Sequence, residues 1–100
     1  MSFRLIEKVF DAGNTAERLS ADHQTCTSVK IQTKRGNSNK VEIAPGEFLT
    51  GKGFELVKPT ADEKLDEMEF TSPGREGIDL YDWYGMGAQN EGVNIIIEEF

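Results

Sequence analysis

The segment of this sequence closest to a known chemical motif runs from Gly46 to Gly53 and reads GEFLTGKG. It fits most of the phosphate-loop pattern GxxxxGK[ST], in which backbone N–H groups and a lysine hold the phosphates of a nucleotide. That pattern also needs a hydroxyl residue for magnesium and a following helix. Here Gly53 occupies the hydroxyl position, and residues 54–58 alternate like a strand that Pro59 ends. We therefore expect a β-turn with a solvated lysine and no bound cofactor.

The single histidine, His23, and the single cysteine, Cys26, are the next candidates for chemistry. A thiol–imidazole pair is catalytic only when the two groups are within hydrogen-bond reach and a third group orients the imidazole. The sequence shows neither condition, so we expect Cys26 to be a small, partly buried residue and His23 to be a loop residue. One cysteine also excludes an internal disulfide and cannot by itself build a zinc site.

Carboxylates gather in one acidic run, which comprises Asp62, Glu63, Asp66, Glu67 and Glu69. Calcium needs about six to eight oxygens that converge from a loop, whereas side chains on an alternating segment diverge. We therefore expect a solvated face and no metal site. A glycosidase pair drawn from these carboxylates, or from Asp79 and Asp82, would need a cleft and a raised pKa. The sequence identifies no catalytic residue, and we expect a protein that is not an enzyme.

An aromatic group, Tyr81, Trp83 and Tyr84, follows near the end of the chain. Exposed rings of this kind stack on sugars or anchor a protein partner, whereas buried rings belong to a core. Strand spacing places Tyr81 and Trp83 on one face and Tyr84 on the other. Because a small domain needs its large apolar residues inside, the core or a subunit interface is the favoured interpretation.

Short segments of period two, separated by turn residues, dominate the sequence and predict an all-β fold. We expect a single small antiparallel β-sandwich or jelly-roll-like domain over residues 1–100. Segments 28–34 and 40–43 are expected to form a hairpin, residues 60–67 allow one helical turn, and residues 85–92 read as a glycine-rich connection. About eight short strands are predicted, at residues 3–10, 15–20, 28–34, 40–43, 53–58, 68–70, 78–84 and 93–98.

The composition limits the possible partners. Eleven basic and 18 acidic residues give a net charge of -7, so the attraction that drives nucleic-acid binding is absent and anionic membranes are disfavoured. The first residues, MSFRLIEK, contain no apolar run of the kind found in a signal peptide. No apolar stretch approaches the ~20 residues of a membrane span. We expect synthesis in a cytoplasm and neither nucleic-acid nor membrane partners.

Several different short motifs follow one another along the chain in an order that is typical of one protein family. GNTAERL at residues 13–19 is followed by CTSVKI at 26–31, the turn Gly36–Asn37, the pair Pro45–Gly46, GFEL at 53–56 and EGVNI at 91–95. This order resembles the small β-sandwich virion proteins of tailed bacteriophages. In that family a G-T-A-x-x-L strand leads to C-x-x-V-x-I-Q, a G-N turn and a final G-x-x-V-x-V/I strand. The resemblance spans roughly residues 9–98.

The resemblance implies a non-enzymatic structural protein on the capsid exterior of a phage particle, made in the host cytoplasm. The favoured role is a capsid decoration (cement) protein that binds the major capsid protein and forms a homotrimer. A phage tail or head-fibre component remains an alternative, as does a carbohydrate-binding or adhesion module.

The two terminal segments are apolar on both faces, which is typical of a central strand or of one covered by another subunit. We therefore expect the partner or oligomer interface to include Phe3, Leu5, Tyr81, Trp83, Tyr84, Ile96 and Phe100.

Overall fold

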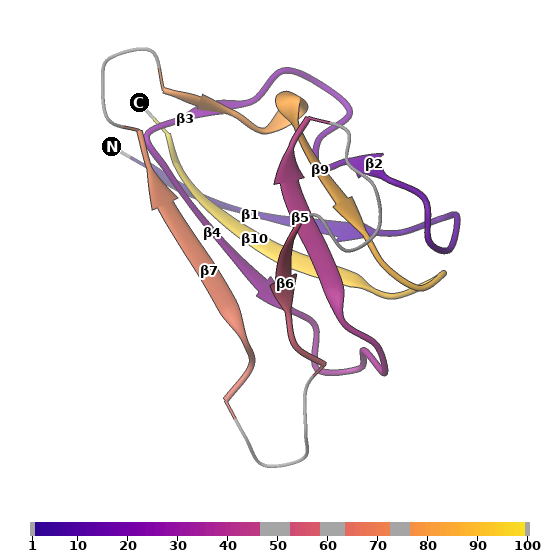
Figure 1. Ribbon diagram of the computed structural model, residues 1–100. Helices are drawn as coiled ribbons and strands as arrows, with labels where there is room; N and C mark the ends of the chain where they lie inside the picture. Colours follow the sequence, from indigo (N-terminus) through magenta and orange to yellow (C-terminus); the bar gives the residue numbers. More distant parts are fainter. Residues whose placement is uncertain (1, 47–52, 59–63, 73–76, 100) are drawn as a thin grey trace.

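The computed structural model describes residues 2–46, 53–58, 64–72 and 77–99, which form two antiparallel four-stranded sheets (Figure 1). The β1 sheet has the order β1 (Ser2–Val9), β10 (Gly92–Glu99), β4 (Ser28–Thr33), β7 (Glu67–Thr71). The β2 sheet has the order β2 (Glu17–Arg18), β9 (Trp83–Met86), β5 (Val41–Pro45), β6 (Phe54–Leu56). A two-stranded ladder, β3 (Thr25–Cys26) with β8 (Ile78–Asp79), and the 3₁₀ turn η1 (Leu80–Asp82) complete the described elements.

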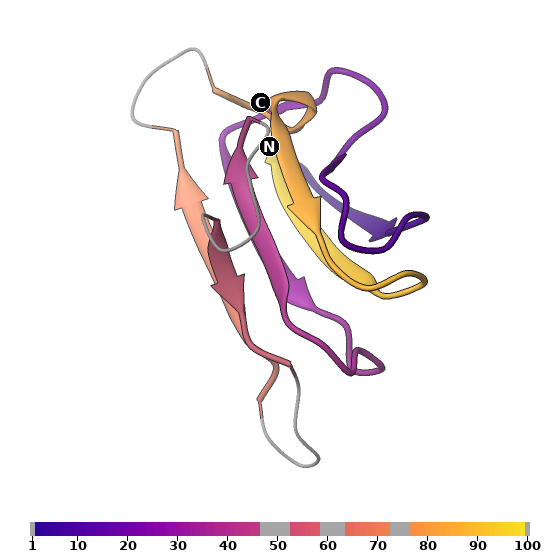
Figure 2. The ribbon, with the colours of Figure 1, turned by 45° about the vertical axis from the view of Figure 1, so that its right-hand side comes forward.

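The strand pairing is that of a jelly roll. The first strand pairs with the tenth, the second with the ninth, the third with the eighth, the fourth with the seventh and the fifth with the sixth, all antiparallel. This is one long hairpin rolled on itself, and the β10–β4 and β5–β9 ladders close the two sheets. Figure 2 shows strands of one sheet lying over strands of the other. The predicted all-β jelly-roll-like sandwich is therefore confirmed, and eight strands make up its two four-stranded sheets.

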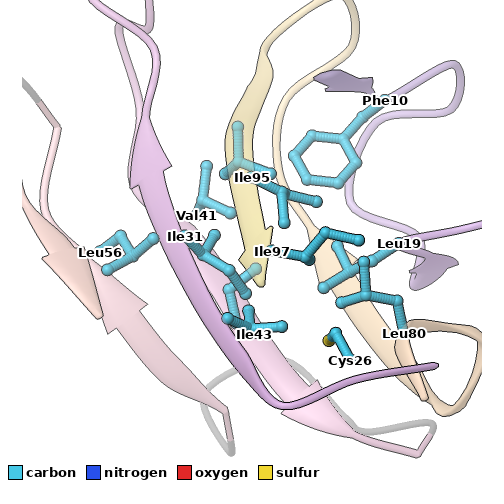
Figure 3. Close-up of a cluster of buried hydrophobic side chains, with 12 residues drawn as sticks. Phe10, Leu19, Cys26, Ile31, Val41, Ile43, Leu56, Leu80, Ile95 and Ile97 are labelled. Carbon is cyan, nitrogen blue, oxygen red and sulfur yellow. The ribbon is translucent and has the colours of Figure 1, made fainter. Parts of the chain in front are cut away.

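The core lies between the sheets and follows the period-two pattern of the sequence. Val29 and Ile31 of β4 and Ile95 of β10 point inward and are fully buried, as the alternation predicts. Each such burial contributes roughly 1.5–3 kcal/mol of gross hydrophobic stabilisation. Figure 3 shows the core extending from Leu56 to Phe10, and the buried cluster comprises Phe10, Leu19, Cys26, Val29, Ile31, Val41, Ile43, Leu56, Leu80, Val93, Ile95 and Ile97.

The predicted hairpin of segments 28–34 and 40–43 is wrong, because β4 and β5 lie in different sheets. Residues 34–40 carry the chain from one layer to the other. Hydrogen bonds to the start of β10 hold this crossing: Glu91 accepts from the N–H groups of Ser38 and Asn39, at 2.9 and 3.1 Å. Both strands place apolar residues toward the core. The alternating sequence pattern that produces this is the same whether the two strands pair in one sheet or lie in different sheets.

The glycine-rich stretch at 85–92 was also predicted incorrectly at its start. Gly85 belongs to β9 rather than to a connection, and it faces the core. A Cβ at this position would lie 3.0 Å from both Leu19 and Phe10, so glycine serves close packing here and not a turn. Of the predicted helical turn, residues 60–63 lie outside the described residues, and the part from Glu67 onward is strand β7. Within the described residues, no helix has the length and apolar character needed to cross a membrane.

Candidate functional site

Three of the predicted interface residues meet on the outer face of the β1 sheet. Leu5 of β1 lies directly opposite Ile96 of β10, and Phe3 lies opposite Glu98, one step along the same face. These side chains are the exposed large hydrophobic residues of their strands: Phe3 is 71%, Leu5 70% and Ile96 43% accessible. We call this group, Phe3, Leu5 and Ile96, the β1/β10 patch. Phe100, the fourth terminal residue predicted for the interface, lies outside the described residues.

Strand alternation explains why these residues face solvent. Ile6 and Ile95, the neighbours of Leu5 and Ile96 along their strands, form the next pair of the ladder and point toward the core. Successive side chains leave a strand on opposite faces, so a strand that is apolar at consecutive positions must expose some of them. The patch is thus the outer half of two terminal strands that are apolar on both faces, as the sequence predicted.

A shallow hollow beside the patch gives it shape. The hollow has a volume of about 160 Å³, and Phe3 and Ile96 supply the apolar side chains that line it. Lys30, Glu69 and Glu98 line the polar side. An apolar surface rimmed by charged residues is the general form of a protein-binding site.

The charged rim is organised by Lys30 of β4. Its Nζ atom lies 3.0 Å from Glu67 and 3.9 Å from Glu69, both on β7. The hydrogen bond from Lys30 lowers the pKa of Glu67, and the same bond raises the pKa of Lys30. Farther along the face, Lys34 forms an ion pair with Glu7 of β1. The two pKa shifts favour the charged forms of Lys30 and Glu67, and the rim carries both signs.

The aromatic residues predicted for the interface are divided among different contacts. Tyr81 and Trp83 do not share a strand face, because Tyr81 lies in the turn η1, where Asp79 accepts a hydrogen bond from its N–H. Trp83 stacks on Phe70 of β7, with ring centroids 4.2 Å apart. Tyr84 points to the opposite side of β9 and is buried. The structure therefore does not assemble these three rings into one surface with the β1/β10 patch.

Tyr81 has two close neighbours of its own. The guanidinium of Arg18 lies 3.8 Å from the centre of the Tyr81 ring and donates a hydrogen bond to the carbonyl oxygen of Tyr81 at 2.5 Å. The ring of His23 lies 4.2 Å from the same centre. The half-buried ring of Tyr81 therefore packs against Arg18 and His23, whereas Trp83 packs on Phe70, so the two rings have different partners.

His23 and Cys26 have separate partners rather than each other. The Nδ1 atom of His23 lies 2.6 Å from Asp79, whereas the thiol of Cys26 donates to the carbonyl of Ile78 at 3.5 Å. Cys26 is fully buried. Burial, together with the negative charges of Asp79 and Glu99, raises the pKa of the Cys26 thiol to about 11. A neutral, buried thiol is a poor nucleophile, and Cys26 is more deeply buried than the partly buried residue that the sequence predicted.

Asp79 is a residue whose importance the sequence reasoning missed. Burial disfavours its charged form, but hydrogen bonds from His23 and from the N–H groups of Gln24 and Tyr81 outweigh that cost and hold its pKa below the usual range. The carboxylate thus joins the β3–β8 ladder to the turn η1. Asp79 is the N-cap of η1 and accepts a hydrogen bond from the N–H of the residue two positions later, Tyr81. An aspartate at the start of a turn is the sequence signal that predicts this arrangement.

The acidic run and the phosphate-loop-like segment are only partly covered by the described residues. Of the acidic run, Asp62 and Glu63 lie outside the described residues, and Asp66 accepts hydrogen bonds from the N–H groups of Val57 and Glu67. Among the residues that are described, no three acidic, histidine or cysteine side chains are grouped to hold a metal. Residues 47–52 of the phosphate-loop-like segment are outside the described part, and the strand expected after it is present as β6.

Two further depressions were not anticipated from the sequence. One, of about 380 Å³, lies at one end of the β2 sheet, and both polar residues such as Asn39 and Glu42 and the apolar Met86 line it. The other, of about 590 Å³, is an open groove between β1 and residues 17–24. Polar and apolar groups line both, and neither contains exposed large apolar residues comparable with the β1/β10 patch.

Comparison with known proteins adds no relative. No family model, curated protein or solved structure matches this chain.

Proposed function

We propose that this chain is a non-enzymatic structural protein of a tailed-phage particle, a capsid decoration protein that binds and stabilises the major capsid lattice. The observation that carries the proposal is the β1/β10 patch, where Phe3 and Leu5 expose about 70% of their surface beside a hollow with a charged rim. The phage setting comes from the ordered motifs of the sequence, and the binding role comes from the patch.

Burial of the patch by a partner is the physical basis of the proposed role. Each Å² of apolar surface removed from water contributes about 25 cal/mol, although the lost freedom of the bound protein offsets much of this. Repetition over a capsid shell would multiply a weak contact by avidity. The jelly roll is itself frequent in viral capsid and lectin domains, which supports the proposal by analogy of fold.

Charge supports a partner that is basic rather than acidic. The chain has a net charge of -7, so a basic capsid surface would attract it and a phosphate backbone would repel it. Glu67 and Glu69 stand at the rim of the hollow together with Lys30, so the rim offers both signs to a partner. Such pairs set the orientation of docking more than its strength.

Co-sedimentation tests the proposal. The purified chain is mixed with undecorated shells of the phage that encodes it, the shells are pelleted, and the bound copies are counted by mass. We expect saturable binding at a fixed ratio to the capsid subunit. No binding to shells would overturn the decoration role, and binding to purified tails instead would assign the chain to the tail.

A matched pair of variants tests whether the patch is the binding surface. Phe3→Ser removes an exposed phenylalanine of the patch, and Phe54→Ser removes another exposed phenylalanine from β6 of the other sheet. We expect Phe3→Ser to lose shell binding and Phe54→Ser to keep it. Equal binding by both variants would show that the β1/β10 patch is not the contact.

A further inference from the structure

The free edge of the β1 sheet offers unpaired backbone groups. β1 is the outermost strand of its sheet, eight residues long, and pairs only with β10 among the described strands. Phe10 donates its N–H to Glu91 at 2.8 Å, and the carbonyl of Gly92 faces the other way, accepting from Lys34 at 3.4 Å. These bonds set which residues of β1 face β10, because backbone groups alternate in direction along a strand. The residues that turn their N–H and C=O to the free edge are Phe3, Leu5, Glu7 and Val9.

We propose that this edge pairs with the β1 edge of a second copy of the chain, antiparallel and across a two-fold axis. The two β1 sheets would then form one continuous eight-stranded sheet, with Leu5 of one copy opposite Leu5 of the other. Edge strands that are long and apolar pair readily with another strand, and a two-fold axis satisfies both copies with the same contact. This contact is separate from binding to a capsid and goes beyond the proposed function.

Charge selects the register. A two-fold antiparallel pairing keeps outward side chains on one face only when it is centred on a single residue. Pairing at least five residues of each β1 strand then limits the central residue to Arg4, Leu5, Ile6 or Glu7. Centring on Arg4 or on Glu7 sets that charge against itself, and centring on Ile6 sets Arg4 against Lys8. Like charges directly opposite one another destabilise a sheet. Only the register centred on Leu5 avoids this, with the pairs Leu5–Leu5, Arg4–Ile6, Phe3–Glu7 and Ser2–Lys8.

The same register joins the apolar surfaces of the two copies. Leu5 already lies opposite Ile96 within one chain, so the pairing would place a row of Ile96, Leu5, Leu5 and Ile96 across the joint. Leu5 is among the residues whose backbone groups face the free edge, so the two central leucines would exchange both N–H···O bonds.

Inward-pointing charges often protect an edge strand from pairing, and β1 carries two of them. Both already have partners inside the chain: Arg4 donates to Gln24 at 2.8 Å and Lys8 to Glu17 at 3.1 Å. These bonds hold both side chains against their own chain, so neither charge is left unpaired at the edge.

Charge exchange at Leu5 tests the pairing, with mass measured by sedimentation equilibrium. We expect the wild-type chain to have twice the mass of one chain, and Leu5→Lys and Leu5→Glu each to have the mass of a single chain. An equimolar mixture of the two variants should recover the double mass, with one copy of each in native mass spectrometry, because Lys and Glu then meet at the centre. Phe54→Lys adds the same positive charge as Leu5→Lys, but on β6 of the other sheet, and it should keep the double mass of the wild-type chain.

Circular dichroism establishes that each variant is folded, as expected for a residue that is 70% exposed. A wild-type monomer at the highest soluble concentration, the trimer expected from the sequence resemblance, or a mixture that stays monomeric would each overturn the two-fold pairing. These outcomes are distinct from those for the proposed function. A monomeric wild type that still saturates capsid shells would remove the pairing alone, and a dimer that binds no shell would remove the decoration role alone.

Discussion

The side chain of Asn37 makes both of its amide hydrogen bonds with the backbone of Gly92. Its Nδ2 donates to the Gly92 carbonyl at 2.8 Å, and its Oδ1 accepts from the Gly92 N–H at 3.1 Å. Asn37 is buried, and it lies in the crossing from β4 to β5. The Asn37 side chain thereby forms the two hydrogen bonds that a neighbouring strand would otherwise make with Gly92 at the start of β10. These bonds fix the point at which the chain passes from the β1 sheet to the β2 sheet.

Removal of this amide should destabilise the fold. Asn37→Ala leaves the Gly92 N–H buried without its partner, and we expect a loss of about 2 kcal/mol in the free energy of unfolding. Urea denaturation followed by circular dichroism measures it. Asn39→Ala, which alters an exposed asparagine of the same crossing, should cost less than about 0.5 kcal/mol. Equal losses in the two variants would contradict the role given to Asn37.

Gly92 should not tolerate a side chain. A Cβ there would lie 2.0 Å from the carbonyl oxygen of Lys8, a backbone atom of the paired strand β1 that cannot move without breaking the ladder. We expect Gly92→Ala to cost about 3 kcal/mol. Gly36→Ala is the matched control, because nothing lies within 4 Å of the added Cβ. Thermal unfolding of both variants tests this, and a Tm for Gly92→Ala equal to that of Gly36→Ala would refute it.

The thiol of Cys26 should be protected in the folded protein. It is buried, and its pKa is raised to about 11, so at pH 8 the thiolate is scarce and out of reach of reagents. We expect labelling by a thiol reagent to be slow in buffer and fast in denaturing urea. Rapid native labelling would show that β3 and its surroundings open readily.

Acid should weaken the fold through Asp79. Its pKa is lowered in the folded state, so its contribution is complete above the unfolded pKa of about 3.9 and is lost as the pH falls below that value. We expect Asp79→Asn to be less stable than the wild type at pH 7 and to lose less stability between pH 5 and 3. Urea midpoints across that range provide the measurement, and parallel curves for the two proteins would exclude Asp79 as the cause.

The sequence by itself determined the local character of this protein. Alternation identified which residues of β4 and β10 face the core, because side chains of a strand alternate regardless of its neighbours. The apolar residues on both faces of the terminal segments predicted an interface that includes Phe3, Leu5 and Ile96, and the structure exposes these three side chains on one face. The neighbouring residues of His23 and Cys26 in the sequence likewise predicted that these two side chains do not form a catalytic pair.

Tertiary structure alone decided how these pieces meet. The alternation of β4 and β5 does not say whether they pair, and contacts with Glu91 and Gly92, more than 50 residues away, made them a crossing instead of a hairpin. The break of the strand at η1, which separates Tyr81 from Trp83, depends on bonds from Asp79 to the distant residues His23 and Gln24. The spacing of residues along a strand predicts the face on which each side chain lies. Which strand or loop packs against that face depends on segments that are distant in the sequence.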